Sequence, residues 1–250
     1  MKLATIICYC SNDERFIRKT IDNALKVSDQ VIVPVSSHWW DGTPEDMESV
    51  TNLANEYPNV NVTSFEWEQG NHTRYGLLTA RNIGVSLVDD DIDWVLFLDA
   101  DEIIDVKAFN EFLKEFPFEN YDSIKIANYT YFREPIYRSL SFEDSAVMVR
   151  KEYAVNDSSL SGLDREQYYD LNNVYQLRKK RMVLHNNLPL IHHFSWVRTK
   201  EQMITKVTTW GHRNDTDWIS LVNEEFSRDF NGKSFYNNDS YEIVENLYNI

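Results

Sequence analysis

Apolar residues follow two alternating patterns in the first part of the chain: short unbroken runs, and longer stretches in which they recur every three or four residues. The run at 3–9 predicts a buried strand, and residues 30–35 and 59–67 predict a second and a third strand. The helical spacing predicts helices that begin near residue 12, cover about 45–56, and lie within 70–88. Strands and helices that alternate in this way predict right-handed crossovers and a mostly parallel central sheet with helices on both faces.

A fourth apolar run, at 94–98, lacks the alternation of a half-exposed strand, so we expect it to be buried on both faces. It ends at three carboxylates, Asp99, Asp101 and Glu102. Open α/β sheets hold their ligands at the carboxyl ends of the strands. Oxygen ligands at that point suit a hard divalent cation, and the usual partner of such a cation is a phosphate.

The Asp-X-Asp pattern also has a simpler explanation, a solvated acidic turn. The chain carries a net charge of −15, and the pattern occurs four times, at 89/91, 91/93, 99/101 and 215/217. Asp99 and Asp101 form the pair that directly follows a buried-strand signal, and we therefore place the candidate site there.

Beyond the acidic cluster the pattern is less regular. It predicts a helix at 106–116, strands at 122–132, 146–149 and 188–197, and helices at 200–212 and 218–230. The stretch 156–173 is polar and predicts a loop or a short-helix insert, and the last twenty residues receive no assignment. At 250 residues the whole chain fits a single domain.

Composition excludes some classes of protein. The net charge of −15 argues against nucleic acid as a partner, because phosphate backbones need Lys and Arg. Cys8 and Cys10 are badly placed for a relaxed disulfide, and the chain shows no signal peptide, so we expect a cytoplasmic protein. No apolar run approaches the ~20 residues of a transmembrane segment. The basic run at 178–181 leaves a peripheral membrane contact open, with a solvated strand edge as the alternative.

With these elements in order, the chain resembles the GT-A-fold glycosyltransferases of the family-2 type. The segments that carry the resemblance are ATIICY at 4–9, DGT at 41–43, ARNIG at 80–84, VLFLDADE at 95–102 and IHHFSWVR at 191–198. The resemblance implies a GT-A domain over 1–250. Within it we expect a Rossmann-like nucleotide-sugar-binding half at 1–105, an acceptor and catalytic half at 106–213, and a C-terminal helical extension at 214–250.

The resemblance also implies an activity: inverting transfer of a sugar from a nucleotide-sugar, usually a UDP-sugar, to a glycan or glycoprotein acceptor. Mn²⁺ or Mg²⁺ would bridge the donor diphosphate. Matched by position, Asp101 contacts the metal, and Asp99 contacts the ribose side of the donor or the metal. The residues expected to bind the nucleotide are Cys8, Tyr9, Cys10, Ser37 and Arg81. Family members often carry an acidic residue where this chain has Ser37, and that residue reads the nucleobase. The resemblance therefore does not identify the nucleobase of the donor.

Further candidates are weighed against ordinary structural roles. His193 matches the family's histidine and is the candidate for a further metal ligand or a diphosphate contact, against a surface or core histidine. His192 shares the apolar side of its strand and is expected in the core. Arg198 would bind the diphosphate or be an exposed helix-end charge. For the catalytic base, Glu143 and Asp164 are the first choices, with Asp144 as a third carboxylate in the same region.

Two other functions compete with sugar transfer. The first is a nucleotidyltransferase that makes a nucleotide-sugar, but that class normally carries a Gly-rich, basic phosphate loop after the first strand, and residues 8–13 contain neither Gly nor Lys. The second is a non-catalytic carbohydrate-binding or scaffold protein with the same fold. The aromatic residues proposed for contacts with sugar rings, or else for the core, are Trp39, Trp40, Tyr129, Tyr131 and Phe132.

Overall fold

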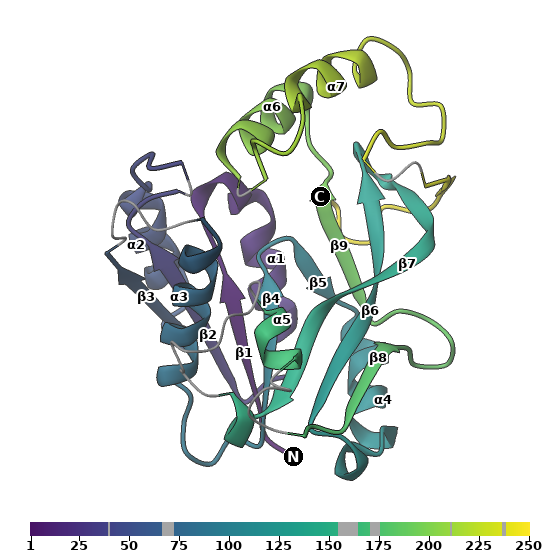
Figure 1. The fold of residues 1–250 in the computed structure, drawn as a ribbon. Helices are drawn as coiled ribbons and strands as arrows, with labels where there is room; N and C mark the ends of the chain where they lie inside the picture. Colours follow the sequence, from purple (N-terminus) through teal and green to yellow (C-terminus); the bar gives the residue numbers. More distant parts are fainter. Residues whose placement is uncertain (40, 67–72, 155–164, 171–175, 211, 237–238) are drawn as a thin grey trace.

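The structure is a computed structural model and describes residues 1–39, 41–66, 73–154, 165–170, 176–210, 212–236 and 239–250. Ten strands of this described part form one sheet, with the main order β3-β2-β1-β4-β7-β6-β9-β5; β10 pairs with β7 and β8 with β6 (Figure 1). The sheet therefore continues from the N-terminal half of the chain into the C-terminal half.

The N-terminal half has the alternation that the sequence predicts. Its elements are β1 (Leu3–Cys8), η1 (Ser11–Asp13), α1 (Glu14–Ala24), β2 (Gln30–Ser36), α2 (Met47–Glu56), β3 (Asn61–Phe65), α3 (Thr73–Ser86) and β4 (Trp94–Asp99). The strands β1 to β4 pair with one another in parallel. The expected α/β sheet with helices around it is confirmed.

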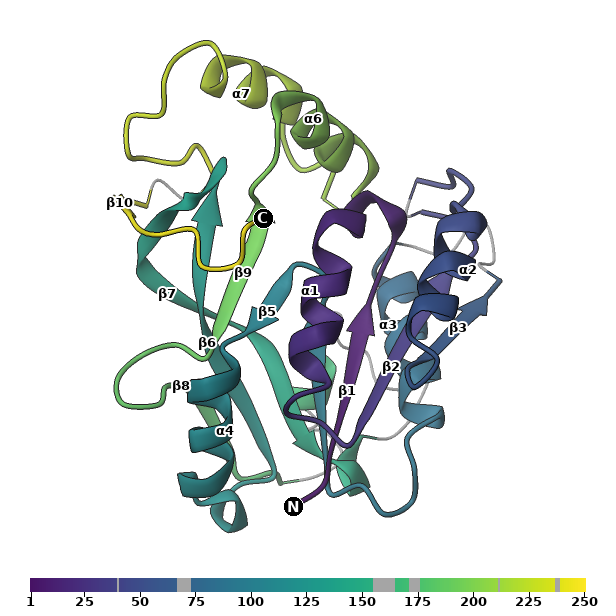
Figure 2. The ribbon, with the colours of Figure 1, turned by 180° about the vertical axis from the view of Figure 1, so that it is seen from behind.

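Both faces of β1 are covered, because its side chains alternate between two cores. Ile7 packs with Ile17 and Ile21 of α1 in one core, whereas Ile6 packs with Leu78 of α3 in the other. The two views agree with this arrangement: α3 lies in front of the sheet in Figure 1, and α1 lies in front in Figure 2. Burial on both faces explains why β1 and β4 are unbroken apolar runs.

The C-terminal half is mixed. Its elements are β5 (Glu102–Ile104), α4 (Val106–Glu115), η2 (Phe118–Asn120), β6 (Ser123–Phe132), β7 (Glu134–Arg150), η3 (Lys151–Tyr153), α5 (Glu166–Tyr169), β8 (Lys179–Val183), β9 (Ile191–Trp196), α6 (Lys200–Thr209), α7 (Trp218–Glu225) and β10 (Tyr241–Ile243). β7 runs antiparallel to both β4 and β6, and β5 runs antiparallel to β9.

Several predicted boundaries in this half were wrong. The strand expected at 146–149 is the end of β7, a 17-residue strand whose first part is polar because it is only partly covered. β5 was not predicted, since three residues carry too little pattern; it exists because it pairs with β9. The helices α6 and α7 end at Thr209 and Glu225, before the expected 212 and 230. Most of the polar stretch 156–173 lies outside the described residues.

The C-terminal segment returns to the sheet after α7. Its strand β10 pairs with β7, with Tyr241 opposite Ser139, and the side chains of Tyr248 and Ile250 pack against a core cluster that contains Phe194. α6 and α7 lie together at one end of the molecule, above the ends of β1 and β9 in Figure 1. Of the helices that the structure describes, none has both the length and the apolar character that crossing a bilayer requires.

Gly84 allows α3 to approach β1 closely. A Cβ at this position would lie 2.5 Å from Cγ2 of Ile6, closer than two carbon atoms can pack. Ile6 is fully buried in β1, so its methyl group cannot move into solvent. The glycine of the ARNIG segment therefore has a packing role: it keeps α3 against the strand that ends at the candidate site.

We expect Gly84→Ala to lower the free energy of unfolding by about 1–3 kcal/mol, because overpacking outweighs the gain in helix propensity of about 1 kcal/mol. Urea unfolding measures the difference. The exposed Ser86 of the same helix supplies the control, and Ser86→Ala should stay within about 0.5 kcal/mol of the parent protein. An increase in stability of Gly84→Ala would show that Ile6 moves aside and that the close approach is not required.

Candidate functional site

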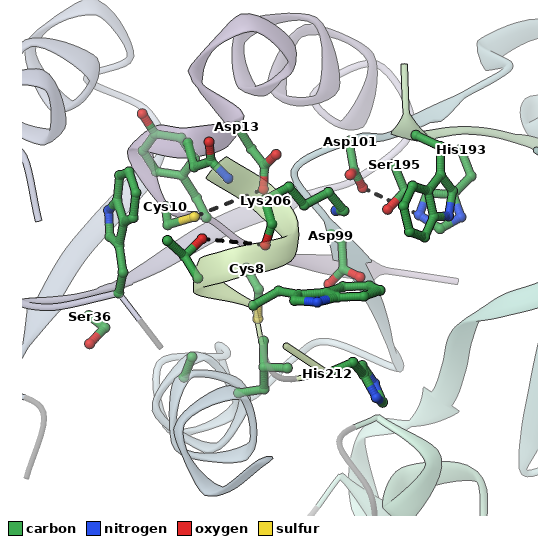
Figure 3. Close-up of a pocket in the computed structure, with 18 of the residues that line it drawn as sticks. Cys8, Cys10, Asp13, Ser36, Asp99, Asp101, His193, Ser195, Lys206 and His212 are labelled. Carbon is green, nitrogen blue, oxygen red and sulfur yellow. Dashed lines mark hydrogen bonds and ion pairs between the residues drawn. The ribbon is translucent and has the colours of Figure 1, made fainter. Parts of the chain in front are cut away.

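A cavity of about 600 Å³ opens at the carboxyl ends of β1 and β4. Cys8 and Asp99 are register partners at the ends of these two strands, and both line the cavity. α6 lies across the opening and contributes Lys206 (Figure 3). The volume falls in the range of pockets that hold cofactor-sized ligands. The site therefore lies at the edge of the sheet that the sequence predicts.

Asp99 is held by two arginines. Its Oδ1 accepts a hydrogen bond from Nη2 of Arg81 at 2.8 Å, and its Oδ2 accepts one from Nη2 of Arg165 at 3.1 Å. Burial alone would raise the pKa of Asp99, but the positive charges of Arg165 and Arg81 outweigh it and lower the pKa below the usual value. Asp99 is therefore an ionised carboxylate with a fixed orientation.

The backbone at Ala100 and Asp101 is fixed by hydrogen bonds from two other elements, α1 and β9. The hydroxyl of Thr20 in α1 donates to the carbonyl oxygen of Ala100 at 2.6 Å, and the N–H of Phe194 in β9 donates to the carbonyl oxygen of Asp101 at 2.9 Å. The Asp101 side chain is thereby directed to His193, with 3.4 Å between Oδ1 and Nε2 (Figure 3). Its other oxygen lies 3.8 Å from Nη2 of Arg198.

The charges of Asp101 and His193 depend on each other. Burial would lower the pKa of His193, but the interaction with Asp101 raises it to about 9, so the imidazole is protonated at neutral pH. Burial would likewise raise the pKa of Asp101, but His193 and more distant cations keep it far below the usual value. His193 is thus brought to the site as predicted, in contact with the second aspartate.

Glu102 does not line the cavity, although it belongs to the same acidic segment. It is fully buried, and both of its oxygens accept hydrogen bonds from Arg165, at 2.6 and 2.8 Å. The hydroxyl of Ser145 donates to Oε1 at 2.5 Å. Glu102 is a structural carboxylate that fixes Arg165 beneath Asp99.

The residues around Asp101 fit a divalent ion only if the ion is shared with a ligand. In the part of the chain that the structure describes, no three His, Cys, Asp or Glu side chains converge as a metal cage. Asp101 and His193 can supply two donor atoms once the imidazole has lost its proton, whereas both oxygens of Asp99 already accept from guanidinium groups. Mg²⁺ and Mn²⁺ are often bound by one or two protein groups together with phosphates and water. The pair fits that arrangement.

Lys206 is a cavity residue that the sequence reasoning missed. Its ammonium has no carboxylate partner within ion-pair distance among the described residues, and it lies 5.7 Å from the ring of Trp210. Burial, followed by the charge of Arg198, lowers the pKa of Lys206, although nearby aspartates oppose this shift. The only sequence signal is its place on α6, where it shares a face with Met203 and Trp210. A half-buried cation without a partner points to an anionic ligand.

Three of the residues predicted to bind the nucleotide line the cavity at the ends of β1 and β2. Cys8, Tyr9 and Cys10 line it, and Ser36 lines it in place of the expected Ser37. Ser37 Oγ instead lies 2.9 Å from Nδ1 of its neighbour His38. Successive side chains of a strand point to opposite faces, so only one of two adjacent serines can face the cavity.

Two predicted arginines lie behind the cavity wall. Arg81 is fully buried beneath Asp99, and Arg198 is 2% exposed, so Arg198 is not an exposed helix-end charge. Arg198 pairs with Asp13 and donates to the carbonyl oxygen of Asn12 at 3.2 Å. Both arginines reach the site through the aspartates they contact.

Two of the three candidates for the catalytic base, Glu143 and Asp144, differ in their surroundings. Glu143 of β7 lines the cavity. Asp144 accepts hydrogen bonds from Nε and Nη2 of Arg181, each at 2.9 Å, and also pairs with Lys125. Asp164 lies outside the described residues.

His192 belongs to the core, as expected. It is 2% exposed, its Nδ1 lies 2.7 Å from the hydroxyl oxygen of Tyr131, and burial lowers its pKa to about 4. Tyr129, Tyr131 and Phe132 are buried as well, so they have the core role. Trp39 lines the cavity, and Trp40 lies outside the described residues.

The fold and the site together define a transferase with a GT-A fold. The model of the family "Glycosyl transferase family 2" matches residues 5–202, and the chain belongs to this family. A search of curated proteins finds no match.

Solved structures show the same fold at low sequence identity. The mannosyltransferase PcManGT of Pyrobaculum calidifontis, described in complex with GDP-Man and Mn²⁺, is 12% identical; the match covers 83% of this chain and 61% of that one, with a TM-score of 0.50. The inositol-1-phosphate CTP transferase of T. maritima is 10% identical, with coverage of 88% and 96% and a TM-score of 0.50. Residues 1–349 of S. aureus TarS are 14% identical, with coverage of 91% and 73% and a TM-score of 0.46.

Proposed function

We propose that this protein is a metal-dependent, inverting glycosyltransferase that moves a sugar from a UDP-sugar to a hydroxyl group of a glycan or glycoprotein. The observation that supports it most is the contact of Asp101 with His193 in the same cavity as Lys206, at the carboxyl end of β4; no carboxylate of the described residues lies within ion-pair distance of Lys206. This combination of anionic and cationic groups suits a metal-bound diphosphate better than a neutral ligand.

In this proposal Asp101 and His193 hold the ion. A bound Mn²⁺ or Mg²⁺ supplies positive charge that stabilises the leaving nucleoside diphosphate without a proton transfer. Lys206 adds a second positive charge from α6, and the cavity wall at 8–10 receives the nucleotide. Asp99, fixed by Arg81 and Arg165, accepts hydrogen bonds from the ribose side of the donor. Arg198 orients Asp101 from behind.

Glu143 is the proposed general base. It lines the same cavity as Asp101 but comes from β7, on the side of the C-terminal segment. In a single displacement the acceptor oxygen bonds to the anomeric carbon while the bond from that carbon to the diphosphate oxygen breaks. The acceptor proton passes to the Glu143 carboxylate. Attack from the side opposite the leaving group inverts the anomeric centre.

A nucleotidyltransferase remains the nearest enzymatic alternative, since the T. maritima CTP transferase shares the fold with the same TM-score as the mannosyltransferase. Two features favour sugar transfer: the family match over 5–202, and a first loop at 8–13 without Gly or Lys. A non-catalytic protein with this fold would bind sugar or nucleotide without releasing UDP, and the measurements below separate it from an enzyme.

We expect Asp101→Asn to reduce turnover of UDP-sugars at least 100-fold, because the amide keeps the size of the side chain but removes the charge that holds a cation. UDP release from UDP-glucose, UDP-galactose and UDP-N-acetylglucosamine with Mn²⁺ measures it, with a melting curve to check the fold. Asp91→Asn serves as the control, since this residue lies in an exposed Asp-X-Asp segment and should keep parental activity. Full turnover in Asp101→Asn would contradict the metal role.

Glu143→Gln should lower kcat by about 10²–10⁴-fold and leave the KM for the donor within a few-fold, because a general base acts on the acceptor and not on donor binding. Initial rates at varied donor concentration give both constants. Glu134→Gln, on the exposed start of the same strand, is the matched control. An unchanged kcat would assign the base elsewhere, with Asp164 as the next residue to change.

Lys206→Met should raise the KM for the donor about tenfold or more, since it removes a cation close to the proposed diphosphate. The free energy of unfolding should stay the same or increase, because a half-buried ammonium with no carboxylate in reach among the described residues is unfavourable in the free protein. Donor kinetics and urea unfolding give the two readouts, with the exposed Lys233→Met as control. A loss of stability without a change in KM would indicate a purely structural lysine.

A further inference from the structure

Four aromatic side chains form one wall of the cavity, here called the aromatic wall: Trp196, Trp210, Trp218 and Tyr236. Trp196 lies at the end of β9, Trp210 directly after α6, and Trp218 at the start of α7. The ring centroids of Trp210, Trp218 and Tyr236 lie 5.4, 6.1 and 4.6 Å from the centroid of Trp196. Because four separate segments build this wall, it cannot be predicted from a local sequence pattern.

Three of these four residues lie beyond the segment that the family model matches, which ends at residue 202. The four side chains are nevertheless packed against the rest of the protein. Trp196 packs with Met203, Val207 and Val222 in a buried core cluster, and Trp210 and Trp218 pack against the same cluster. The indole N–H of Trp218 donates to the carbonyl oxygen of His212 at 2.8 Å. The wall is therefore an ordered part of this chain, added to the shared family core.

The geometry leaves aromatic surface open to the cavity. Trp210 meets Trp218 and Trp196 edge to face, at interplanar angles of 74° and 83°, and the rings of Trp218 and Tyr236 are tilted by 40° and 38° against Trp196. Trp218 is only half-buried, and Tyr236 is 43% exposed. The indole N–H of Trp210 is buried and finds no acceptor among the described residues. Thr209, His212 and Asp215 add polar groups to the same lining.

The wall lies on the side of the cavity where the proposed base is found. Tyr236 and Glu143 are close enough that, after burial, the charge of Glu143 is the second cause that raises the pKa of the Tyr236 hydroxyl. Glu143 also contributes, after Asp101 and Glu102, to the raised pKa of His193, and it lines the same cavity. Glu143 is thus near both the Asp101–His193 pair and the aromatic wall.

We propose that the aromatic wall binds the acceptor as a pyranose ring, with one apolar face of the sugar stacked on an indole and its hydroxyl groups turned to the polar lining. This inference rests on the proposed glycosyltransferase activity, and it narrows the acceptor to a sugar. A sugar ring has an apolar C–H face and a polar edge, which match aromatic faces bordered by an indole N–H, a hydroxyl and a carboxylate. A lipid chain would leave the buried Trp210 N–H without a partner.

The first test measures binding without a donor. The probes are the methyl β-D-pyranosides of glucose, galactose, N-acetylglucosamine and xylose, studied by saturation-transfer difference NMR. We expect saturation of the C–H protons on one face of at least one sugar. The signal should fall strongly in Trp218→Ala and in Tyr236→Ala, and should persist in Trp218→Phe, which keeps an aromatic face. Ile219→Ala, next to Trp218 but 48% exposed and outside the cavity lining, is the matched control.

The second test uses the donor that the parent protein turns over. With the bound pyranoside as acceptor, Trp218→Ala should raise the acceptor KM about tenfold, which corresponds to about 1.4 kcal/mol, and should raise the donor KM less. Tyr236→Ala keeps the test decisive if Trp218→Ala does not fold, because Tyr236 lies outside the helices.

The outcomes separate the two proposals. Pyranosides that fail to bind the parent protein, or that bind Trp218→Ala and Tyr236→Ala as well as the parent, would overturn the sugar subsite even if UDP-sugars are turned over. Transfer to a serine peptide or to a lipid alcohol in preference to every pyranoside would overturn it too. Absence of any UDP release by the parent protein, together with pyranoside binding at the wall, would instead refute the glycosyltransferase activity and leave the sugar site standing.

Discussion

The buried ion pair between Glu102 and Arg165 is the interaction on which the site depends. Glu102 is 0% exposed and Arg165 6% exposed, and a buried charge without its partner would be strongly unfavourable. Since both oxygens of Glu102 bind Arg165, the arginine has a single orientation, in which its Nη2 also reaches Asp99. The end of β4, the start of β5 and the residue that precedes α5 are thereby joined at one point. Arg81 of α3 completes the support of Asp99 from the other side.

This network divides the charged groups into two kinds. Glu102 has its hydrogen-bonding capacity largely used within the protein. Asp99 is fixed by one guanidinium hydrogen bond on each oxygen, and each oxygen can still accept another. Asp101 and Lys206 are different: Asp101 has only longer contacts, at 3.4 and 3.8 Å, and Lys206 has no carboxylate within ion-pair distance in the described part of the chain. Groups of the second kind retain capacity for a ligand. A ligand that carries both a cation and a phosphate would satisfy both, which is why a bridged diphosphate suits this cavity.

The N-terminal half could be predicted from the sequence because its signals are local. Buried parallel strands give unbroken apolar runs, and the carboxyl end of such a strand is the expected place for a ligand, so Asp99 and Asp101 followed directly. The failures have a different origin. Choosing Ser37 instead of Ser36 is a one-residue error in a strand with alternating faces, and the sequence does not say which face meets the cavity. β7 was missed over most of its length because a partly exposed strand is polar. Lys206 could not be selected, since its role comes from where α6 lies relative to β4.

Different parts of the cavity are formed by different stretches of the chain. The part of the cavity around Cys8, Asp99 and Asp101 comes from residues 8–101 and from β9, all within the matched family segment, whereas most of the aromatic wall comes from residues after 202. In the proposed function, specificity for the donor and specificity for the acceptor would therefore be encoded in separate stretches of the chain. The C-terminal segment is held in place by β10 on β7, the same strand that carries Glu143, and by aromatic packing under Trp196. In the proposed function, a change in that segment would thus alter which acceptor is bound and would leave the buried charges around Asp99 in place.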